Sequence, residues 1–332
     1  MENMDIKAYI KSKWIPIAGN MKTPKPLYDY YKELNSTQPC VYNEYGELYK
    51  FYFIRDIHMA AEPYTNLGRY FIWDRYNWGF KTHFYTHNAM LQTLGKPNTK
   101  YGMLIESRAI TPNDYKIFKK HKGLEREFEQ IYTFDDEILN DISNAVFYPA
   151  SADFWYAKEK PELLTENSYK NKTKNISFLS SNKVMCEMHK KRIAAAKYCH
   201  NNHLADVYGK VVSNNYVEIE TPLQNYRFSF AVENEQTDYY FTEKITNCFA
   251  AQTIPIYFGA RKINEFFNED GIIRITEKDF ENIEHIIKQC TKEEYEQRLP
   301  AVLDNYQRVQ EYRNMQDYLY EHYLQENEEN SL

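Results

Sequence analysis

The segment from Asp238 to Gly259, DYYFTEKITNCFAAQTIPIYFG, places an acidic and a basic residue together where a helix should begin. Thr242 is a good N-cap, so Glu243 and Lys244 fall in the first turn. Unpaired N–H groups and the helix dipole attract phosphate there, and Lys244 would add a full charge. Glu243 could accept hydrogen bonds from the vicinal hydroxyls of a sugar. The segment could therefore hold a ribose and a diphosphate. A simpler interpretation is that Glu243 and Lys244 are two solvent-facing residues of a first helical turn. The same tripeptide, Thr-Glu-Lys, also occurs at Thr276–Lys278.

A further carboxylate stands at the end of an apolar run. The run Tyr101–Ser107 (YGMLIES) is typical of a buried strand that leads into a polar loop, and Glu106 lies near its end. A carboxylate in such a place can act as a general base if its surroundings raise its pKa. The commoner case is a strand-end residue that points into water, and the spacing alone does not choose between the two.

Two short basic runs could also meet anions. His189–Arg192 lies about two turns into a helix that we expect after the strand Ile176–Ser181, with Asn182 as its cap. This run is either a solvated helical face, which the charge alone favours, or a second phosphate clamp. The other run, Lys119–Lys122, is expected to be a solvated surface.

Several other chemistries find no support in the residue pattern. The chain contains neither GxGxxG nor GxxxxGK[ST], which argues against dehydrogenases and P-loop proteins. His83 and His87 are four residues apart, as metal ligands on one helix face can be, but they lack an HExxH glutamate, so we expect no metal site. The five cysteines form no CxxC, which favours a reducing compartment. A net charge of −6 argues against nucleic acid as the main partner.

The elements that must position these residues alternate between strand and helix in the second half of the chain. Such alternation is typical of a parallel α/β fold. The predicted strands are Ile176–Ser181, Ala205–Lys210, Arg227–Val232, Thr253–Gly259 and Gly271–Ile275; the predicted helices run from Asn182 to about Asn201, from Thr242 onwards, and through Glu277–Cys290.

The first half of the chain is less regular, and a polar stretch separates it from the second. We expect a helix at Lys25–Asn35, strands at Glu47–Ile57, Arg69–Asp74 and Ala145–Ala150, and a strand that turns into a short helix within Glu129–Ile142. The polar stretch Ala157–Asn175 suits an exposed linker. A length of 332 residues fits two domains, which we place at 1–156 and 157–332.

The two ends of the chain carry weaker signals. The N-terminal residues show no apolar core of signal-peptide length, and no apolar run approaches the length of a membrane span. The charged, Tyr-rich tail Glu294–Asn327 is mostly helical in pattern. We interpret it as closing helices that pack on the core; the alternative is a segment that docks on a membrane or self-associates.

The residues around the first segment resemble a known family. FSFAVENEQTDYYFTEKITNCFAAQTIPIYFG (Phe228–Gly259) is similar to the signature of α-1,3/1,4-fucosyltransferases, glycosyltransferase family 10. The matching residues, in order, are Glu233-Asn234, Tyr240, Thr242–Lys244, an alanine-containing helix, Pro255 and Gly259. ISFLSSN with the basic helix and ADVYGK also resembles the family, as does LIES at Leu104–Ser107. The resemblance is strong over 176–275, weaker over 101–156 and faint before that.

The resemblance implies a GT-B architecture, an α/β fold in which two Rossmann-like domains face each other across a cleft. The N-terminal domain would bind the acceptor and the C-terminal domain the donor, GDP-fucose. By this resemblance Tyr240, Glu243 and Lys244 contact the nucleotide, with Glu243 on the ribose and Lys244 on the diphosphate. A basic residue in the helix after the Ser-Asn turn also binds the diphosphate.

The alignment of that basic residue is loose, so Lys190 and Arg192 are both candidates, and Arg192 is the better bidentate partner. The same resemblance adds Asn182, Glu233 and Asn234 to the nucleotide-sugar site. It assigns Glu106 as the general base of an inverting transfer. Glu106 would take the proton of an acceptor hydroxyl while that oxygen displaces GDP from the anomeric carbon. The protein would supply no metal ligands, and Mg²⁺ or Mn²⁺ bound loosely to the diphosphate is compatible with this.

Two departures from the family pattern leave alternatives open. Val232 stands where the family has Phe, and Glu235 where it has Ser, so the donor sugar or the acceptor contacts could differ. The alternatives are a GT-B transferase that uses another nucleotide sugar, and a catalytically inactive protein that binds nucleotides or glycans. The expected partners are a GDP-sugar and an oligosaccharide or glycolipid acceptor. We expect a cytoplasmic protein, with peripheral contact to the inner face of the membrane as a variant.

Overall fold

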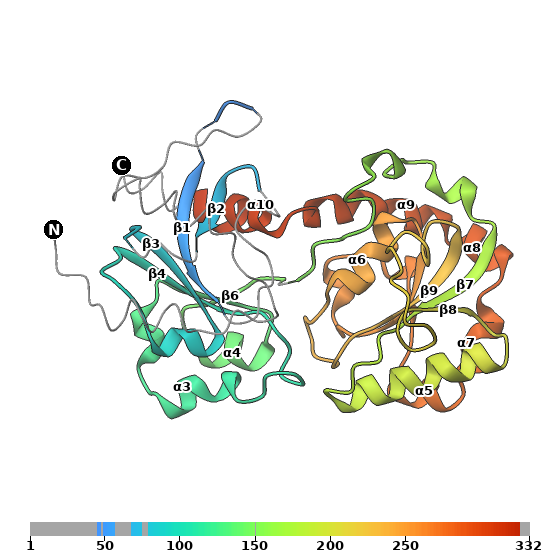
Figure 1. Ribbon diagram of the computed structural model, residues 1–332, viewed down its shortest axis with the longest axis horizontal. Helices are drawn as coiled ribbons and strands as arrows, with labels where there is room; N and C mark the ends of the chain where they lie inside the picture. The colour runs from blue at the N-terminus through green and yellow to red at the C-terminus, as the bar shows by residue number, and fades with distance from the viewer. Residues whose placement is uncertain (1–44, 48, 57–67, 75–78, 150, 326–332) are drawn as a thin grey trace. The chain divides into compact units, whose positions relative to one another are not determined.

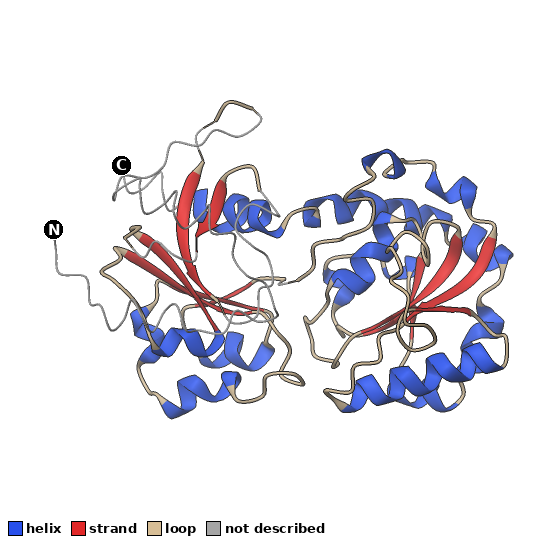
Figure 2. Cartoon of the chain, viewed as in Figure 1, coloured by secondary structure: helices blue, strands red, loops and turns tan. Residues whose placement is uncertain are grey.

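The structure is a computed structural model that describes residues 45–47, 49–56, 68–74, 79–149 and 151–325. The chain divides into two compact units (Figure 1): the first comprises 1–106, 111–148 and 316–332, and the second comprises 107–110 and 149–315. In each unit the described residues build a parallel β-sheet with helices packed around it (Figure 2). The predicted helix at Lys25–Asn35 lies outside the described residues.

The first unit is built on a six-stranded sheet in the order β2-β1-β3-β4-β5-β6. Its strands are β1 (Lys50–Arg55), β2 (Phe71–Asp74), β3 (Thr82–Thr86), β4 (Thr99–Leu104), β5 (Gln130–Thr133) and β6 (Ala145–Phe147). Its helical segments are short: η1 (His87–Leu91), η2 (Asp114–Lys116), α3 (Ile117–Lys120), η3 (Leu124–Glu127), α4 (Asp136–Asp141), and, from the end of the chain, α10 (Met315–Leu319) and η10 (Tyr320–Leu324). Stacked aromatic side chains such as Phe84 and Tyr101 fill the sheet face, with ring centroids 4.8 Å apart.

The second unit is built on a five-stranded sheet in the order β11-β10-β9-β7-β8. Its strands are β7 (Lys174–Leu179), β8 (Asp206–Tyr208), β9 (Tyr226–Val232), β10 (Ile254–Phe258) and β11 (Ile273–Arg274). Phe178, Phe230 and Ile256 are all buried, as expected for parallel strands that are covered on both faces. These strands confirm the alternating α/β pattern predicted for this half of the chain.

Helices cover both faces of the second sheet. Helix α6 and helix α9 lie on one side, and α5 and α7 on the other (Figure 1). The segments are η4 (Pro161–Leu163), η5 (Ser168–Asn171), α5 (Glu187–Asn201), α6 (Glu243–Ala250), η6 (Ile263–Glu265), η7 (Glu269–Gly271), η8 (Glu277–Glu281), α7 (Ile283–Gln289), α8 (Lys292–Gln297), α9 (Leu299–Arg308) and η9 (Val309–Tyr312). Helix α6 begins as predicted: Thr242 is its N-cap and accepts a hydrogen bond from the Lys244 N–H.

The predicted cap of the basic helix is wrong. Helix α5 begins at Glu187 with Cys186 at the N-cap, and Asn182 is an exposed residue of the preceding loop. In this loop the Met185 N–H donates to the His189 ring at 3.1 Å rather than to a helical carbonyl. Asn182 therefore does not start the helix.

The polar stretch predicted as an exposed linker packs on the second unit. The Lys172 side chain is buried there and donates hydrogen bonds to the Leu223 carbonyl (2.9 Å) and the Thr253 hydroxyl (2.8 Å). Burial lowers the pKa of Lys172 to about 7. The Tyr169 N–H is held by Gln252 at 2.7 Å. Composition alone misses such packing, because each polar group finds its partner on a distant part of the chain.

The tail forms helices that pack on the protein, as predicted from its sequence. Its residues are divided between the two units. Tyr295 and Tyr306 are buried within the second unit, whereas Tyr320 stacks on Tyr70 of the first, with ring centroids 4.4 Å apart. The compact units consequently divide at Pro149 and Gln316 rather than at residue 157 alone. No helix among the described residues is long and apolar enough to cross a membrane.

Candidate functional site

The topology of the second unit marks one place where a ligand can bind. In the order β11-β10-β9-β7-β8 the chain reverses direction across the sheet between β7 and β9. Open parallel sheets bind ligands outside the carboxyl ends of the strands at such a switch point. Ser180 and Ser181 follow β7 there, and Glu233 and Asn234 follow β9. The predicted nucleotide residues of this half belong to these two loops or to the helices that come after them.

Glu233 is the buried centre of this site. Its side chain has no exposed area, and its Oε1 accepts hydrogen bonds from the Thr242 N–H (2.8 Å) and hydroxyl (2.9 Å). Its other oxygen, Oε2, lies 2.9 Å from the Lys244 ammonium. The family resemblance placed Glu233 among the nucleotide contacts, but the structure uses its carboxylate to fix the start of α6.

Lys244 is the cation that this carboxylate orients. Its ammonium also contacts the Thr242 hydroxyl at 2.8 Å and lies 3.4 Å from the Glu243 carboxylate. Burial by itself would lower the pKa of Lys244, but the charges of Glu233 and Glu243 outweigh burial and raise the pKa. Lys244 is therefore charged at neutral pH, with 23% of its side chain exposed. A held, charged and accessible ammonium at a helix start is suited to an anion.

Glycine is required beside this cluster. A Cβ on Gly259, at the end of β10, would lie 2.2 Å from the Tyr257 hydroxyl and 2.7 Å from Cγ of Glu233. Both neighbours are buried, so neither can give way. The Gly of the family signature thus has a packing reason: it leaves room for the buried glutamate.

The structure distinguishes between the two basic candidates on α5. Arg192 is buried, and its Nη2 donates to the Ser181 hydroxyl at 3.2 Å. Its Nε is buried without a hydrogen-bond partner among the described residues. Burial lowers the pKa of Arg192, and the nearby Glu233 and Glu243 carboxylates oppose that shift. Lys190 points the other way and forms an exposed pair with Glu187 at 2.6 Å. Arg192 therefore lies in the candidate site beside Ser181, and Lys190 lies on the solvated face.

His189 is a member of the site that we missed when we considered the basic run as a whole. Its ring is buried; Nδ1 accepts the Met185 N–H, so Nε2 carries the proton and donates to Asn234 Oδ1 at 2.8 Å. Burial lowers the pKa of His189, which keeps the ring neutral. Asn234 in turn faces the Tyr240 hydroxyl at 3.5 Å. Tyr240 is buried, so this chain of contacts holds the loop after β9 in place.

Glu106 lies in the first unit, two residues after the end of β4, and several hydrogen bonds hold its backbone. The buried His87 ring accepts the Ile105 and Glu106 N–H groups through Nε2, each at 3.1 Å. Its Nδ1 faces the Asp114 carboxylate at 3.1 Å, so Nδ1 carries the proton. The Tyr115 hydroxyl donates to the Glu106 carbonyl. These contacts fix the backbone of Glu106, whose side chain is half-buried.

His83 and His87, the two histidines considered as metal ligands, make hydrogen bonds within the first unit. His83 lies on β3, where its ring contacts the Tyr85 hydroxyl and the Phe80 carbonyl, each at 2.8 Å. His87 follows at the start of η1 and binds backbone N–H groups. Within the described residues, no group of three or more His, Cys, Asp or Glu side chains could hold a metal ion.

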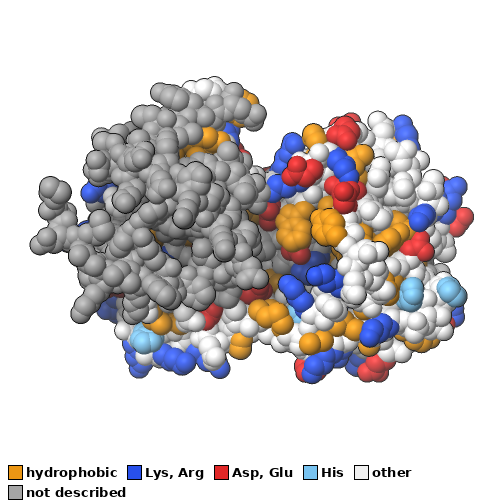
Figure 3. Space-filling model, in the orientation of Figure 1, with side chains coloured by type: hydrophobic (Ala, Val, Ile, Leu, Met, Phe, Trp, Pro, Cys, Tyr) orange, Lys and Arg blue, Asp and Glu red, His pale blue; other side chains and the backbone are white. Residues whose placement is uncertain are grey.

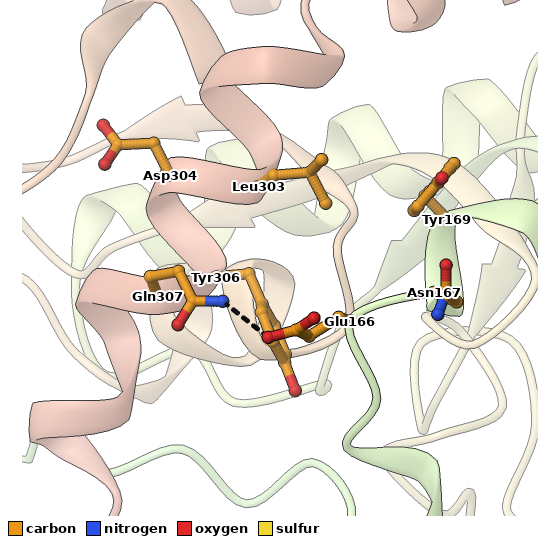
Figure 4. A pocket seen from close by; sticks show the side chains of 7 residues that line it. All are labelled: Glu166, Asn167, Tyr169, Leu303, Asp304, Tyr306 and Gln307. Carbon is orange, nitrogen blue, oxygen red and sulfur yellow. Dashed lines mark hydrogen bonds between the residues drawn. The ribbon is translucent and has the colours of Figure 1, made fainter.

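A cavity of about 420 Å³ lies elsewhere in the second unit (Figure 4). It is formed where η5 and the residues before it meet α9, and its lining residues are Glu166, Asn167, Tyr169, Leu303, Asp304, Tyr306 and Gln307. Gln307 donates to Glu166 across it at 3.4 Å. None of the predicted site residues lines it, so it is separate from the cluster around Glu233.

The visible surface of the second unit mixes Lys and Arg with acidic and hydrophobic side chains (Figure 3). It shows no broad field of one sign, and binding to a nucleic-acid backbone requires such a basic field. The anion-binding features are instead local: Lys244, Arg192 and the first turns of α5 and α6. This scale suits a small anionic ligand.

The fold and the site together define a class: a Rossmann-like unit with a phosphate-compatible switch point, in a chain that also contains a second parallel α/β unit. Residues 169–299 match the family model described as glycosyltransferase family 10 (fucosyltransferase) C-term. This match over the second half of the chain confirms the resemblance found in the sequence.

Two known proteins show how far the likeness extends. The α-(1,3)-fucosyltransferase FucT of Helicobacter pylori is 35% identical over 65 residues, and the match spans 20% of this chain and 13% of that protein. A crystal structure of an α1,3-fucosyltransferase with GDP-fucose is 15% identical, with a TM-score of 0.50 over 92% of this chain and 94% of the other. The structural likeness confirms the predicted α/β fold class, GT-B with two Rossmann-like units.

Proposed function

We propose that this protein is an inverting fucosyltransferase, which transfers fucose from GDP-fucose to a hydroxyl group of an acceptor glycan. The observation that carries the proposal is the match of residues 169–299 to the fucosyltransferase family. The matched region holds Lys244 and Arg192 at the switch point of the second sheet, where a nucleotide diphosphate would be expected. The structural relative named above was crystallised with GDP-fucose, which supports the choice of donor.

The candidate site residues of the second unit would have two kinds of role: some would bind the nucleotide, and others would hold those residues in place. Lys244 and Arg192 would bind the diphosphate, because both are charged and Arg192 has a buried N–H that no described residue accepts. Glu243, with 18% of its side chain exposed, would accept hydrogen bonds from the ribose hydroxyls. The supports would be the buried Glu233, Thr242, His189 and Tyr240 together with the partly buried Asn234, which would orient these ligands.

The chemical step would begin at Glu106. Its carboxylate would take the proton of the acceptor hydroxyl as that oxygen attacks the anomeric carbon from the face opposite GDP. The bond from the anomeric carbon to the β-phosphate oxygen breaks with its electrons, and the negative charge grows on the diphosphate. Lys244, Arg192 and the N–H groups at the starts of α5 and α6 would stabilise that charge. Mg²⁺ or Mn²⁺ on the diphosphate is compatible with this scheme and needs no protein ligands.

A thermal-shift screen against GDP, UDP and ADP tests the donor half. A ligand that binds only the folded protein raises its melting temperature, so GDP should raise it most. A larger shift with UDP or ADP would contradict the proposal and favour a transferase with another nucleotide sugar. Incubation with a panel of nucleotide sugars, followed by measurement of nucleotide release, then identifies the donor.

The second Thr-Glu-Lys tripeptide provides a matched control for the phosphate contact. Lys244→Ala should weaken GDP binding about 10- to 100-fold by calorimetry, because a charged contact is lost. Lys244→Gln keeps a hydrogen-bond donor near Glu233 and should still weaken binding. Lys278→Ala, at an exposed position of η8, should leave GDP affinity unchanged. Equal affinities for the Lys244 and Lys278 variants would refute the assigned role.

An inactive nucleotide-binding protein is the second candidate. It would bind GDP through the same residues but release none from any GDP-sugar, with or without glycan acceptors. Turnover that depends on Glu106 distinguishes the two. The oligosaccharide or glycolipid acceptor, the cytoplasmic location and the membrane contact stay predictions.

A further inference from the structure

The turn that follows Glu106 is bound by a carboxylate from a distant part of the chain. Glu106 groups with the first unit, whereas the turn Ser107–Ile110 directly after it groups with the second. Glu235, in the loop after β9, accepts the Arg108 N–H through Oε1 at 2.8 Å and the Ala109 N–H through Oε2 at 3.2 Å. Each oxygen of one carboxylate thus holds one of two consecutive backbone N–H groups.

These two hydrogen bonds hold the turn in one conformation. Ser107 is buried, and its carbonyl accepts the Ile110 N–H at 3.1 Å, so three successive N–H groups of the turn have acceptors. Hydrogen bonds to an ionised carboxylate are stronger than neutral ones, and a pair of them also sets an orientation. Glu235 is half-buried, which limits the competition from water. A shift of the turn must therefore break charge-assisted hydrogen bonds.

The backbone of Glu106 itself is held by other residues. The His87 ring accepts the Ile105 and Glu106 N–H groups, each at 3.1 Å, and the Tyr115 hydroxyl donates to the Glu106 carbonyl. Along the chain, Glu106 is thus held at its own backbone by His87 and Tyr115 and at the following turn by Glu235. Loss of either set of contacts would free the backbone from which the Glu106 carboxylate extends.

Glu235 belongs to the same short loop as two supports of the candidate nucleotide site. Glu233 accepts hydrogen bonds at the start of α6, and Asn234 accepts the ring N–H of His189 on α5 at 2.8 Å. Three consecutive side chains after β9 therefore hold α6, α5 and the turn that follows Glu106. The loop that supports the proposed diphosphate ligands also holds the turn beside the proposed general base.

We propose that Glu235 is a positioning residue for the transfer reaction: by holding Arg108 and Ala109, it sets the place of the Glu106 carboxylate. The inference rests on the proposed function and on Glu106 as its general base. A general base must lie within hydrogen-bond reach of the proton it takes, and a misplacement of about 1 Å can cost about 100-fold in rate. Glu235 itself contacts no reacting atom in this scheme. The family pattern has Ser at this position, which offers one oxygen instead of two, so this carboxylate is particular to the present chain.

The test measures the turnover number and the GDP affinity of the full chain with Glu235→Ala. Turnover is GDP release at saturating GDP-fucose, with water and with a panel of glycans as acceptors, and affinity is measured by calorimetry with GDP. We expect turnover to fall about 10- to 100-fold because the base is displaced, while GDP affinity stays within about two-fold. Asp279→Ala, on η8, is the matched control: the Asp279 carboxylate accepts the Thr276 N–H at 2.6 Å, and its loss should change neither quantity.

A double variant separates positioning of the base from a general structural effect. If Glu235 acts through Glu106, adding Glu235→Ala to Glu106→Gln should lower turnover little further, because residues that act as a unit are not additive. Unchanged turnover in Glu235→Ala, an equal loss of GDP affinity, or losses that multiply in the double variant would each overturn the inference. If Glu235→Ala does not fold, Glu235→Gln is judged by the same measurements; it keeps the length of the side chain and one acceptor oxygen, so its expected loss of turnover is smaller.

The other variants separate this inference from the proposed function. No GDP release by the unaltered protein, with any acceptor, would overturn both. Transfer that is unaffected by Glu106→Gln would overturn the assignment of the base and this inference, while fucose transfer would stand. Transfer that depends on Glu106 but not on Glu235 would overturn this inference alone.

Discussion

Glu106 and Glu233 both end apolar parallel strands, one in each unit. Glu106 follows β4 and keeps a half-buried side chain, while His87 and Tyr115 hold its backbone. Glu233 follows β9, and its buried carboxylate contacts Lys244 and Thr242. The same local pattern thus gives one carboxylate that can reach a ligand and another that can only hold its neighbours. The partners that the fold brings to a strand end, rather than the strand end itself, decide the role of the residue.

Two buried histidines, His87 and His189, also have roles that are decided by the partners that the fold brings to them. His87 accepts N–H groups of the residues at the end of β4, and His189 accepts the Met185 N–H in the loop after β7. Each ring then contacts an acceptor on its other nitrogen, Asp114 for His87 and Asn234 for His189. Both histidines therefore order a loop at the carboxyl edge of a sheet.

The sharpest test of the two glutamates is Glu106→Gln. We expect transfer to fall about 10²- to 10⁴-fold, the usual contribution of a general base, while GDP affinity stays unchanged. Transfer is measured as GDP release from GDP-fucose in the presence of glycan acceptors, and affinity by calorimetry. Turnover retained within a few-fold would sink the assignment of Glu106.

Glu233→Gln should act on stability instead. Removing one member of a buried ion pair costs about 3–5 kcal/mol, because Lys244 loses its buried counterion and keeps only the Glu243 carboxylate at 3.4 Å. Denaturant unfolding should therefore show a large loss, with GDP binding weakened as well. Glu106→Gln serves as the control. Because the Glu106 side chain is only half-buried, this substitution should lower the free energy of unfolding far less. Equal losses of stability in the two variants would contradict the claim that Glu233, unlike Glu106, is a buried structural support.

The two basic residues on α5 sharpen the comparison within the second unit. Arg192→Ala should weaken GDP binding about 10- to 100-fold, because a desolvated guanidinium contact to phosphate is lost. Lys190→Ala should leave the affinity within about two-fold, because exposed ion pairs such as Lys190–Glu187 contribute little. Calorimetric titration of both variants with GDP measures the two affinities. A larger effect from Lys190 would show that the orientation of α5 has been misjudged.

The smallest expected effect is the pH dependence that His189 confers. Burial lowers its pKa in the folded protein below the usual value of about 6.5, so the unfolded chain binds the proton first. The free energy of unfolding should therefore fall as pH drops below about 6.5, and the loss should stop below the folded pKa. His189→Gln should flatten this part of the stability curve. A stability that rises on acidification through this window would contradict the neutral ring.

Some features of this protein follow from the sequence alone. The strands, the Thr242 cap and the order of Glu233, Tyr240, Glu243 and Lys244 are local, because backbone sterics, capping and apolar periodicity act over a few residues. Those residues were enough to predict the α/β fold, the resemblance to the family and the sheet edge at which the candidate site lies.

Only the tertiary structure decided which polar side chains of the candidate site are buried among protein partners and which face solvent. It buried Glu233, turned Arg192 inward and Lys190 outward, and moved the start of α5 from Asn182 to Glu187. It also placed the polar stretch before β7 against the second unit and sent the last helix to the first. The physical reason is that burial and pairing depend on partners far apart in the sequence. Glu233 and Lys244 are eleven residues apart and Arg192 and Glu233 forty-one apart, and no local pattern encodes their meeting.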